Sequence, residues 1–329
     1  MSTEKIWGQD RAVEQFATAW ASRKLHHAWL LAGPKGVGKA SFANAAARRV
    51  LAEAAGPSFD LPGIETDDDH PIVKLVDAGS HPDMRWLERL TDEKTDKLKR
   101  NISVDQVRSL AELFGLSPAM SDWRVAVIDT VDDLETSGAN ALLKMLEEPP
   151  PNTLFFLVSH APGRLLPTIR SRCRRLAFST WSEDEAADFV ASRAGLDADD
   201  ARRLAQMAHG APGRALSLNE EGALEADRSA HDILRQLPNA DEAKLLAIAD
   251  RFRGPEGQAR FNLIVERLAD QVQTMIHQSA AAGETHGLSR WAEAWSRLSD
   301  LPGEAEAINL DRADAFFSVI GELRAAARA

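Results

Sequence analysis

A glycine-rich stretch, Gly33-Pro34-Lys35-Gly36-Val37-Gly38-Lys39, directly follows a short apolar run at 28–32. After Lys39, apolar residues recur at helical spacing, at Phe42, Ala46 and Val50. A strand, a glycine loop and a helix in this order are typical of a phosphate-binding loop, because the glycines let backbone N–H groups turn toward phosphate oxygens and the helix N-terminus favours negative charge. We therefore predict that Gly33, Gly36, Gly38 and Lys39 contact the phosphates of a nucleotide.

The loop departs from the usual pattern at the residue after its lysine. A Ser or Thr usually stands there, and its hydroxyl binds the Mg²⁺ that accompanies the nucleotide. Here the position holds Ala40, and the next hydroxyl, on Ser41, is turned about 100° further around the helix axis. The sequence predicts that ATP or ADP can occupy the loop, with weak or absent Mg²⁺ binding.

A second apolar run, 125–128, is followed by Asp129 and Thr130. An Asp at the end of such a strand is placed to contact Mg²⁺, although it can also merely cap the strand. A hydrolytic ATPase of this type commonly has a Glu next, as the base that orients the attacking water. Thr130 has no carboxylate and cannot act as this base. Together, Ala40 and Thr130 predict a loop that can bind nucleotide in a chain whose own ATP hydrolysis is absent or feeble.

Alternating strands and helices predict a parallel α/β sheet for the first half of the chain. The further strands are expected at 125–128 and 154–158, with weaker candidates at 84–87 and 176–178, and helices at 104–114 and 139–147. Residues 54–72 interrupt this pattern with prolines and an acidic run, which indicates a surface insertion.

Strand signals end after residue 178. Ser182 and Glu185 form a capping box that begins a helix, further helices are expected at 199–209, before Gly210, and from Pro212, and everything from about 223 has helical patterning. The clearest apolar stripe, which we assign to a core, is Phe261, Ile264, Leu268, Val272 and Met275. We predict an α/β P-loop core at 1–178, a three-helix lid at 179–222 and an all-α domain at 223–329.

Composition limits the classes of partner. The formal net charge of −11 argues against a chain that grips nucleic acid alone, and the basic cluster Lys94, Lys97, Lys99 and Arg100 has acidic neighbours typical of a solvated loop. The single cysteine, Cys173, excludes a four-cysteine zinc site, and we predict no metal centre. The sequence has no apolar run of membrane-spanning length and no visible secretory signal, so we expect a cytoplasmic protein with no membrane partner.

Arg172 lies in the stretch Leu165-Leu166-Pro167-Thr168-Ile169-Arg170-Ser171-Arg172-Cys173, just before the last predicted core strand. It could be a surface charge, a salt-bridge partner, or an arginine finger offered to a phosphate on another subunit. A guanidinium suits the last task because it stays charged and donates in a planar fork. Composition alone does not decide between these roles.

The segment 139–150, Ala-Asn-Ala-Leu-Leu-Lys-Met-Leu-Glu-Glu-Pro-Pro, together with Ser171-Arg172-Cys173, resembles the clamp-loader branch of the AAA+ superfamily. Supporting matches are Gly8-Gln9, His27-Ala28, His81-Pro82-Asp83 and the lid motif 210–216, which has Arg214 at the second sensor position. Within this branch the chain is most similar to the delta-prime family of bacterial DNA polymerase III. The matches are dense from about 6 to 216, and the last third matches only in being helical.

The resemblance implies a ring in which delta, the motor subunits gamma or tau, and delta-prime open the sliding clamp and load it on primed DNA. It implies that Arg172 completes the ATP site of the adjacent motor, that Asp129 and Arg214 face the chain's own nucleotide site, and that the helical C-terminal part is a collar. The chain would belong to the polymerase holoenzyme without a polymerase active site of its own.

One departure from the family and two open assignments accompany this resemblance. Residues 54–80 lack the four-cysteine zinc module that many relatives carry, so the insertion is expected to be metal-free or differently folded. The first sensor falls on either Ser159 or His160. Trp291 and Trp295, one helical turn apart, fit either the core of the collar or a contact with another subunit.

Two enzymatic alternatives are weighed against this interaction role. The first is a working AAA+ ATPase, either a motor-type clamp-loader subunit or another remodeller. The second is a nucleotide kinase, for which the helical C-terminal half shows no acceptor pocket or catalytic carboxylates.

Overall fold

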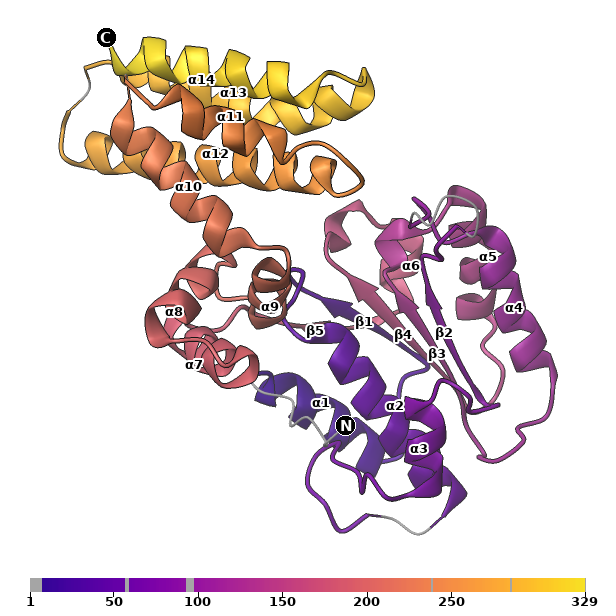
Figure 1. Cartoon of the computed structure of the whole chain (residues 1–329). Helices are drawn as coiled ribbons and strands as arrows, with labels where there is room; N and C mark the ends of the chain where they lie inside the picture. The colour runs from indigo at the N-terminus through magenta and orange to yellow at the C-terminus, as the bar shows by residue number, and fades with distance from the viewer. Residues whose placement is uncertain (1–7, 57–58, 93–97, 238, 285, 329) are drawn as a thin grey trace. The chain divides into compact units, whose positions relative to one another are not determined.

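The computed structural model describes residues 8–56, 59–92, 98–237, 239–284 and 286–328. Its first part is built around a five-stranded parallel sheet with the strand order β2-β3-β4-β1-β5 (Figure 1). The strands are β1 (Ala28–Ala32), β2 (Met84–Glu88), β3 (Arg124–Asp129), β4 (Thr153–Ser159) and β5 (Arg174–Ala177). All five predicted strands are confirmed, although β5 begins two residues earlier than predicted.

Helices cover both faces of this sheet, which explains why the central strands are continuously apolar. One face packs against α1 (Asp10–Ala21), α2 (Lys39–Ala55) and α3 (Pro71–Asp77), and the other against α4 (Val104–Gly115), α5 (Thr136–Glu147) and α6 (Pro167–Ser171). Alternate residues of β1 divide between the two layers: Trp29 and Leu31 enter the first core, and Leu30 enters the second. Carboxyl ends of parallel strands meet at one edge, and β1 delivers the glycine loop there.

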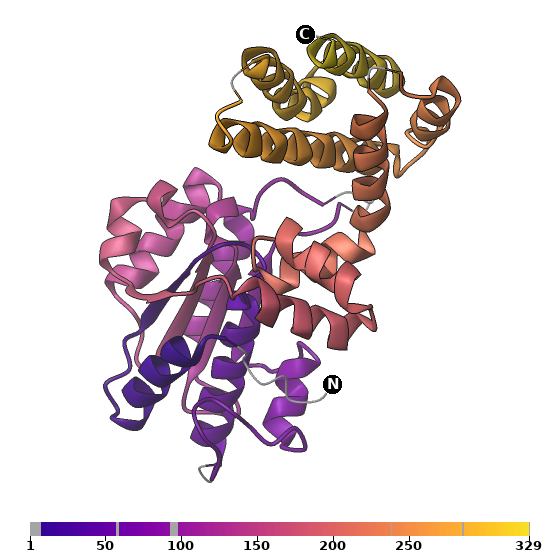
Figure 2. The same cartoon turned by 90° about the vertical axis from the view of Figure 1, so that its left-hand side faces the viewer.

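Three helices follow the sheet: α7 (Glu183–Ala194), α8 (Ala198–Met207) and α9 (Pro212–Glu220). The predicted capping box is present, because Ser182 Oγ accepts from the amide of Glu185 at 3.3 Å and the Glu185 carboxylate accepts from the amide of Ser182 at 3.1 Å. The remaining helices are α10 (Ala223–Gln236), α11 (Glu242–Asp250), α12 (Gly257–Ala281), α13 (Leu288–Ala307) and α14 (Arg312–Ala327). The predicted fold class is confirmed as a parallel α/β core followed by three helices and an all-α C-terminal region (Figure 2).

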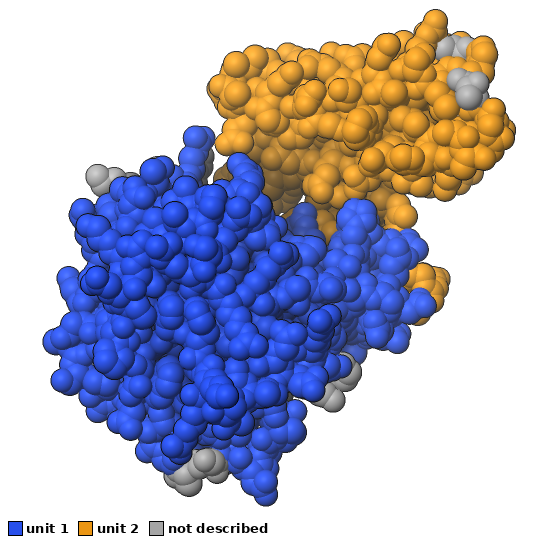
Figure 3. Space-filling view, turned by 180° about the vertical axis from the view of Figure 1, so that it is seen from behind, with its two compact units in different colours: residues 1–195, 205–215 blue, residues 196–204, 216–329 orange. Residues whose placement is uncertain are grey.

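Two compact units divide the chain, residues 1–195 with 205–215 and residues 196–204 with 216–329 (Figure 3). This division passes through α8 and α9, and the predicted boundaries at 178 and 222 stay predictions. In the second unit, Phe261, Ile264, Leu268 and Val272 are buried in one core, as the stripe predicted. Trp291 and Trp295 pack against that same core, which supports their assignment to the interior of the domain.

Two expectations concern the surface. Lys99 and Arg100 are exposed, whereas Lys94 and Lys97 lie outside the described residues. Within the part of the chain that the structure describes, no helix combines the length and the apolar character that crossing a bilayer requires.

Candidate functional site: a nucleotide loop and a separate arginine

The glycine loop connects β1 to α2 and has the backbone that the sequence predicts. Gly36 and Gly38 adopt φ values of 81° and 91°, a region that residues with a side chain rarely enter. Gly38 is the N-cap of α2, and its carbonyl accepts from the amide of Phe42 at 2.9 Å. The side chain of Phe42 is fully buried and fixes the start of α2 against the sheet. The loop is therefore held at a helix N-terminus, where anions bind most readily.

Lys39 is directed into its own loop. Its ammonium donates to the carbonyl of Gly33 at 2.7 Å and also to the carbonyl of Pro34. The residue is 3% exposed, and burial lowers the pKa of Lys39 to about 8, although the carboxylates of Asp129 and Asp132 act in the opposite direction. Two of the three lysine donors that would contact phosphate are thus engaged by carbonyl oxygens of the loop.

The first turn of α9 packs on the loop from outside. The amide of Gly213 donates to the carbonyl of Gly36 at 2.8 Å. A methyl group on Gly36 would come within 2.3 Å of the backbone nitrogen of Arg214, so only glycine fits between the two segments. The structure brings the predicted second-sensor position, Arg214, next to the glycine loop.

Gln9 is a residue of this site that the sequence analysis did not include. Its side-chain amide donates to the carbonyl of Val37 at 3.2 Å and to that of Ser179 at 2.9 Å. It therefore joins the loop to the segment that leads into α7. The only signal in the sequence was the pair Gly8-Gln9, which had been noted as a family match without a role.

Asp129 lies at the end of β3, level with Glu88 at the end of β2. Burial raises the pKa of Asp129, the nearby Glu88 raises it further, and Lys39 acts in the opposite direction. The structure therefore brings the predicted Asp129 close to the loop lysine. Thr130, which follows it, is buried and presents no acid.

The sensor position is organised by Asp132, which lies in the short 3-10 helix Val131–Asp133. Its carboxylate accepts from Ser159 Oγ at 2.8 Å and from the backbone amide of His160. Ser159 is fully buried, whereas part of His160 reaches the surface. The pKa of His160 is lowered, first because the imidazole is partly desolvated and then by the charge of Lys39. Of the two sensor candidates, His160 is thus the one open to a ligand near the loop.

The magnesium-binding groups are incomplete in the described chain. Ala40 lies in the first turn of α2 without a hydroxyl, and the hydroxyl of Ser41 is on an exposed face of the helix. Asp129 remains, but no group of three or more His, Cys, Asp or Glu among the described residues could hold a metal ion. The donors present fit Mg²⁺ poorly.

Arg172 follows α6, and its guanidinium has two polar contacts within the described residues. One terminal nitrogen pairs with the carboxylate of Glu147, the last residue of α5, at 2.8 Å, and the other donates to the carbonyl of Thr168 at 3.0 Å. The Arg172 side chain is 35% exposed. The adjacent Cys173 is half-buried, and burial raises the pKa of its thiol to about 12, so this thiol stays unreactive.

The cysteine-free insertion is ordered by an arginine. Arg49 is 8% exposed and donates to the carbonyls of Leu61 at 3.1 Å, Glu65 at 2.7 Å and Phe59 at 3.3 Å. It also pairs with Glu53 at 2.7 Å. One buried guanidinium therefore joins the carbonyls of three residues of the insertion to α2.

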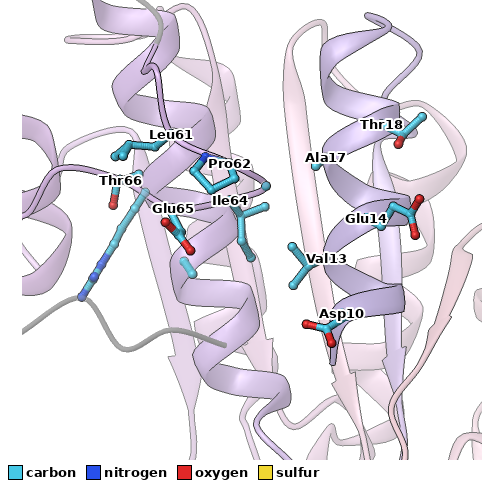
Figure 4. Close-up of a pocket in the computed structure, with 13 residues that line it drawn as sticks. Asp10, Val13, Glu14, Ala17, Thr18, Leu61, Pro62, Ile64, Glu65 and Thr66 are labelled. Atoms are coloured by element: carbon cyan, nitrogen blue, oxygen red, sulfur yellow. The ribbon is translucent and has the colours of Figure 1, made fainter. Parts of the chain in front are cut away.

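A cavity of about 580 Å³ lies between α1 and residues 61–66 (Figure 4). Val13 and Ile64 line it with apolar surface, and Asp10, Glu14 and Glu65 add acidic groups. None of the predicted site residues lines this cavity, so it is separate from the glycine loop.

Comparison with known proteins supports the resemblance found in the sequence. A family model described as DNA polymerase III, delta subunit, matches residues 8–182. The DNA polymerase III subunit delta' of Pseudomonas aeruginosa is 33% identical over 204 residues, which cover 60% of this chain and 57% of that protein. The subunit delta' of Escherichia coli K12 is 28% identical over 269 residues, which cover 82% of this chain and 75% of that protein.

A gamma subunit is similar as well. The DNA polymerase III subunit gamma of Buchnera aphidicola is 31% identical over 189 residues, which cover 57% of this chain and 48% of that protein. The matched part of the chain spans little more than half the length of the first of these relatives.

Proposed function

Because the chain belongs to the DNA polymerase III delta-subunit family, we propose that it acts as a clamp-loader subunit of the delta-prime type. In this role it joins delta and the motor subunits gamma or tau in a ring that loads the sliding clamp on primed DNA during replication. It serves as a stator, contributes Arg172 to the ATP site of a neighbouring motor subunit, and hydrolyses little or no ATP itself.

The observation that carries this proposal is the setting of Arg172. A finger that acts on a neighbour's phosphate must be fixed on its own subunit and still be reachable from outside. Arg172 meets both conditions, because Glu147 and Thr168 tether its guanidinium while 35% of the side chain stays exposed. Arginine keeps its charge at any physiological pH, so the finger needs no activation.

The chain's own loop supports the second half of the proposal. Lys39 donates to the loop carbonyls of Gly33 and Pro34, Ala40 supplies no hydroxyl, and Thr130 supplies no carboxylate base. Phosphates of ATP or ADP can still be held by the loop amides of Gly36 and Gly38, with Arg214 and His160 nearby, whereas the amide of Gly33 donates to the carbonyl of Ser159 at 3.3 Å. Hydrolysis also needs a positioned water and a bound Mg²⁺, and the site lacks the Glu that would orient the water and the hydroxyl that would bind the metal.

Reconstitution tests the function directly. A complex of delta, the motor subunits, the sliding clamp and this chain should load the clamp on primed DNA, and the same mixture without the chain should not. Equal loading with and without the chain would contradict the proposed membership in the ring.

The second candidate is an active AAA+ ATPase, and the specific observation in its favour is that Lys39 and Asp129 are both retained and lie close together. Turnover by the purified chain decides between the two. We expect background turnover from the wild-type chain and from Asp129→Asn alike, whereas turnover that Asp129→Asn abolishes would favour the enzyme.

A further inference from the structure

The carboxylate of Glu147 is the side chain that fixes the predicted finger. It pairs with one terminal nitrogen of Arg172 at 2.8 Å, while the carbonyl of Thr168 holds the other at 3.0 Å. Both supports are anchored in the sheet core, because Leu146, next to Glu147, is 2% exposed and Ile169, at the base of the finger, is 1% exposed. The guanidinium thus contacts one residue of each of two neighbouring helices, α5 and α6, whose positions Figure 1 shows.

The position of Glu147 is electrostatically unfavourable for the helix that carries it. It is the last residue of α5, and Glu148 caps the same end. Carboxylates at a helix C-terminus face the negative end of the helix dipole, where cations are preferred. The charge of Arg172 offsets this cost for Glu147. Since both side chains of the pair are more than a third exposed, the pair adds little to folding stability.

The pairing leaves the guanidinium able to bind a phosphate. Arginine carries five N–H donors, and the two contacts within the chain use one donor on each terminal nitrogen. The remaining N–H groups keep the planar fork that suits phosphate oxygens. What the pairing removes is rotational freedom, which an exposed arginine would otherwise lose on engaging its target.

We propose that Glu147 is a positioning residue for Arg172, and that its carboxylate holds the finger in the orientation in which it meets a phosphate of the neighbouring subunit. This inference rests on the proposed function. Glu147 acts only through Arg172 and contacts no nucleotide itself.

The test compares Glu147→Ala and Glu147→Gln with the matched control Glu148→Ala, which removes the same charge one residue further on. Each change is made with Arg172 present and in an Arg172→Ala background. The assembled ring is assayed for ATP hydrolysis stimulated by clamp and primed DNA, with kcat and KM separated, and melting of the chain is followed in parallel.

We expect Glu147→Ala to lower kcat at the affected site about threefold to tenfold, because the finger loses its preorganisation. Melting and KM should change little. Glu147→Gln keeps an oxygen acceptor at the same place and should stay within about twofold of wild type. Glu148→Ala should match wild type, and Glu147→Ala should have no further effect in the Arg172→Ala background.

The outcomes separate the inference from the function on which it rests. If Arg172→Ala leaves hydrolysis at the wild-type rate, the finger role itself fails. If Arg172→Ala lowers the rate but Glu147→Ala behaves like Glu148→Ala, raises the rate, or lowers it equally without Arg172, the positioning role of Glu147 is overturned.

Discussion

The glycine loop (residues 33–39) and the segment at the end of α6 that carries Arg172 (residues 171–173, here the arginine loop) place their positive charges in opposite environments. Lys39 is 3% exposed and donates to two carbonyls of its own loop, whereas the Arg172 side chain is 35% exposed and is paired through one terminal nitrogen with Glu147. The lysine is turned inward and the arginine is left accessible. Under the proposed function, this difference corresponds to a glycine loop that contributes mainly to the structure and an Arg172 that acts on a neighbouring subunit.

The packing around the glycine loop supports this distinction. Gly36 lies directly under the first turn of α9, with the amide of Gly213 bonded to its carbonyl. Gln9 adds two further hydrogen bonds to the surroundings of the loop. The loop therefore connects the sheet to the segment before α7, through Gln9, and to the first turn of α9, through Gly213. This structural role does not require ATP hydrolysis.

Replacing Arg172 should have the largest effect. Arg172→Ala removes the charge offered to the neighbouring site, and loss of a finger in trans costs about 10³-fold or more in the rate at that site. The loss measured for the whole ring will be smaller if the other sites keep hydrolysing ATP. Arg170→Ala, an exposed arginine on the same short helix, is the matched control and should keep the wild-type rate. Equal ATPase rates in Arg172→Ala and Arg170→Ala rings would show that Arg172 has no special role, and the contrast between it and Lys39 would be lost.

Gly36→Ala tests the structural role of the cradle. The new methyl group would meet the backbone of Arg214 at 2.3 Å and impose strain at φ 81°, so we expect a loss of about 3 to 4 kcal/mol in the free energy of unfolding. Gly79→Ala is the control, because Gly79 also has a positive φ but has nothing within 4 Å of its added methyl. That variant should lose only about 1 to 2 kcal/mol. Similar urea unfolding curves for the two variants would mean that α9 does not hold the loop.

The burial of Lys39 predicts a pH dependence of stability. Its pKa is about 8 in the folded chain and 10.5 when exposed, so between these values the unfolded state binds more protons and the free energy of unfolding rises with pH. The rise attributable to Lys39 is at most about 3 kcal/mol. Lys39→Met should abolish this part of the rise when unfolding is compared from pH 7 to 10.5. Parallel pH profiles for the two proteins would show that the lysine is not buried in this way.

The smallest expected effect is that of magnesium on nucleotide binding. Because Ala40 has no hydroxyl, adding Mg²⁺ should change the affinity of the isolated chain for ATP or ADP by less than about twofold, or under about 0.5 kcal/mol. Ala40→Ser restores the hydroxyl and should introduce a dependence on Mg²⁺. If nucleotide binding by the wild-type chain already depends on Mg²⁺ as much as binding by this variant, the loop would resemble that of an active ATPase.

Much of the fold could be predicted because it depends on local patterns. The apolar runs at 28–32, 125–128 and 154–158 mark central strands buried on both faces, and the Ser182 capping box marks a helix start. The glycine loop was equally visible, since φ values of 81° and 91° require glycine at positions 36 and 38. Local sequence specifies such features without knowledge of the tertiary structure.

The contacts that distinguish the two loops were not predictable in the same way. Glu147 and Arg172 are separated by a strand and a connecting segment, and their pairing depends on how α5 and α6 pack on the sheet. Gln9 meets Val37 and Ser179 only because α1 and the segment before α7 converge at the loop. Arg49 likewise donates to the carbonyls of three residues of the insertion. In each case a long polar side chain finds partners that its own neighbourhood in the sequence does not reveal.

One assay compares the two loops within a single ring. Complexes that carry Lys39→Ala or Arg172→Ala in this chain are first shown to assemble, and their ATP turnover is then measured with clamp and primed DNA. The account predicts wild-type turnover for Lys39→Ala and a marked loss for Arg172→Ala. A loss with Lys39→Ala and none with Arg172→Ala would contradict it.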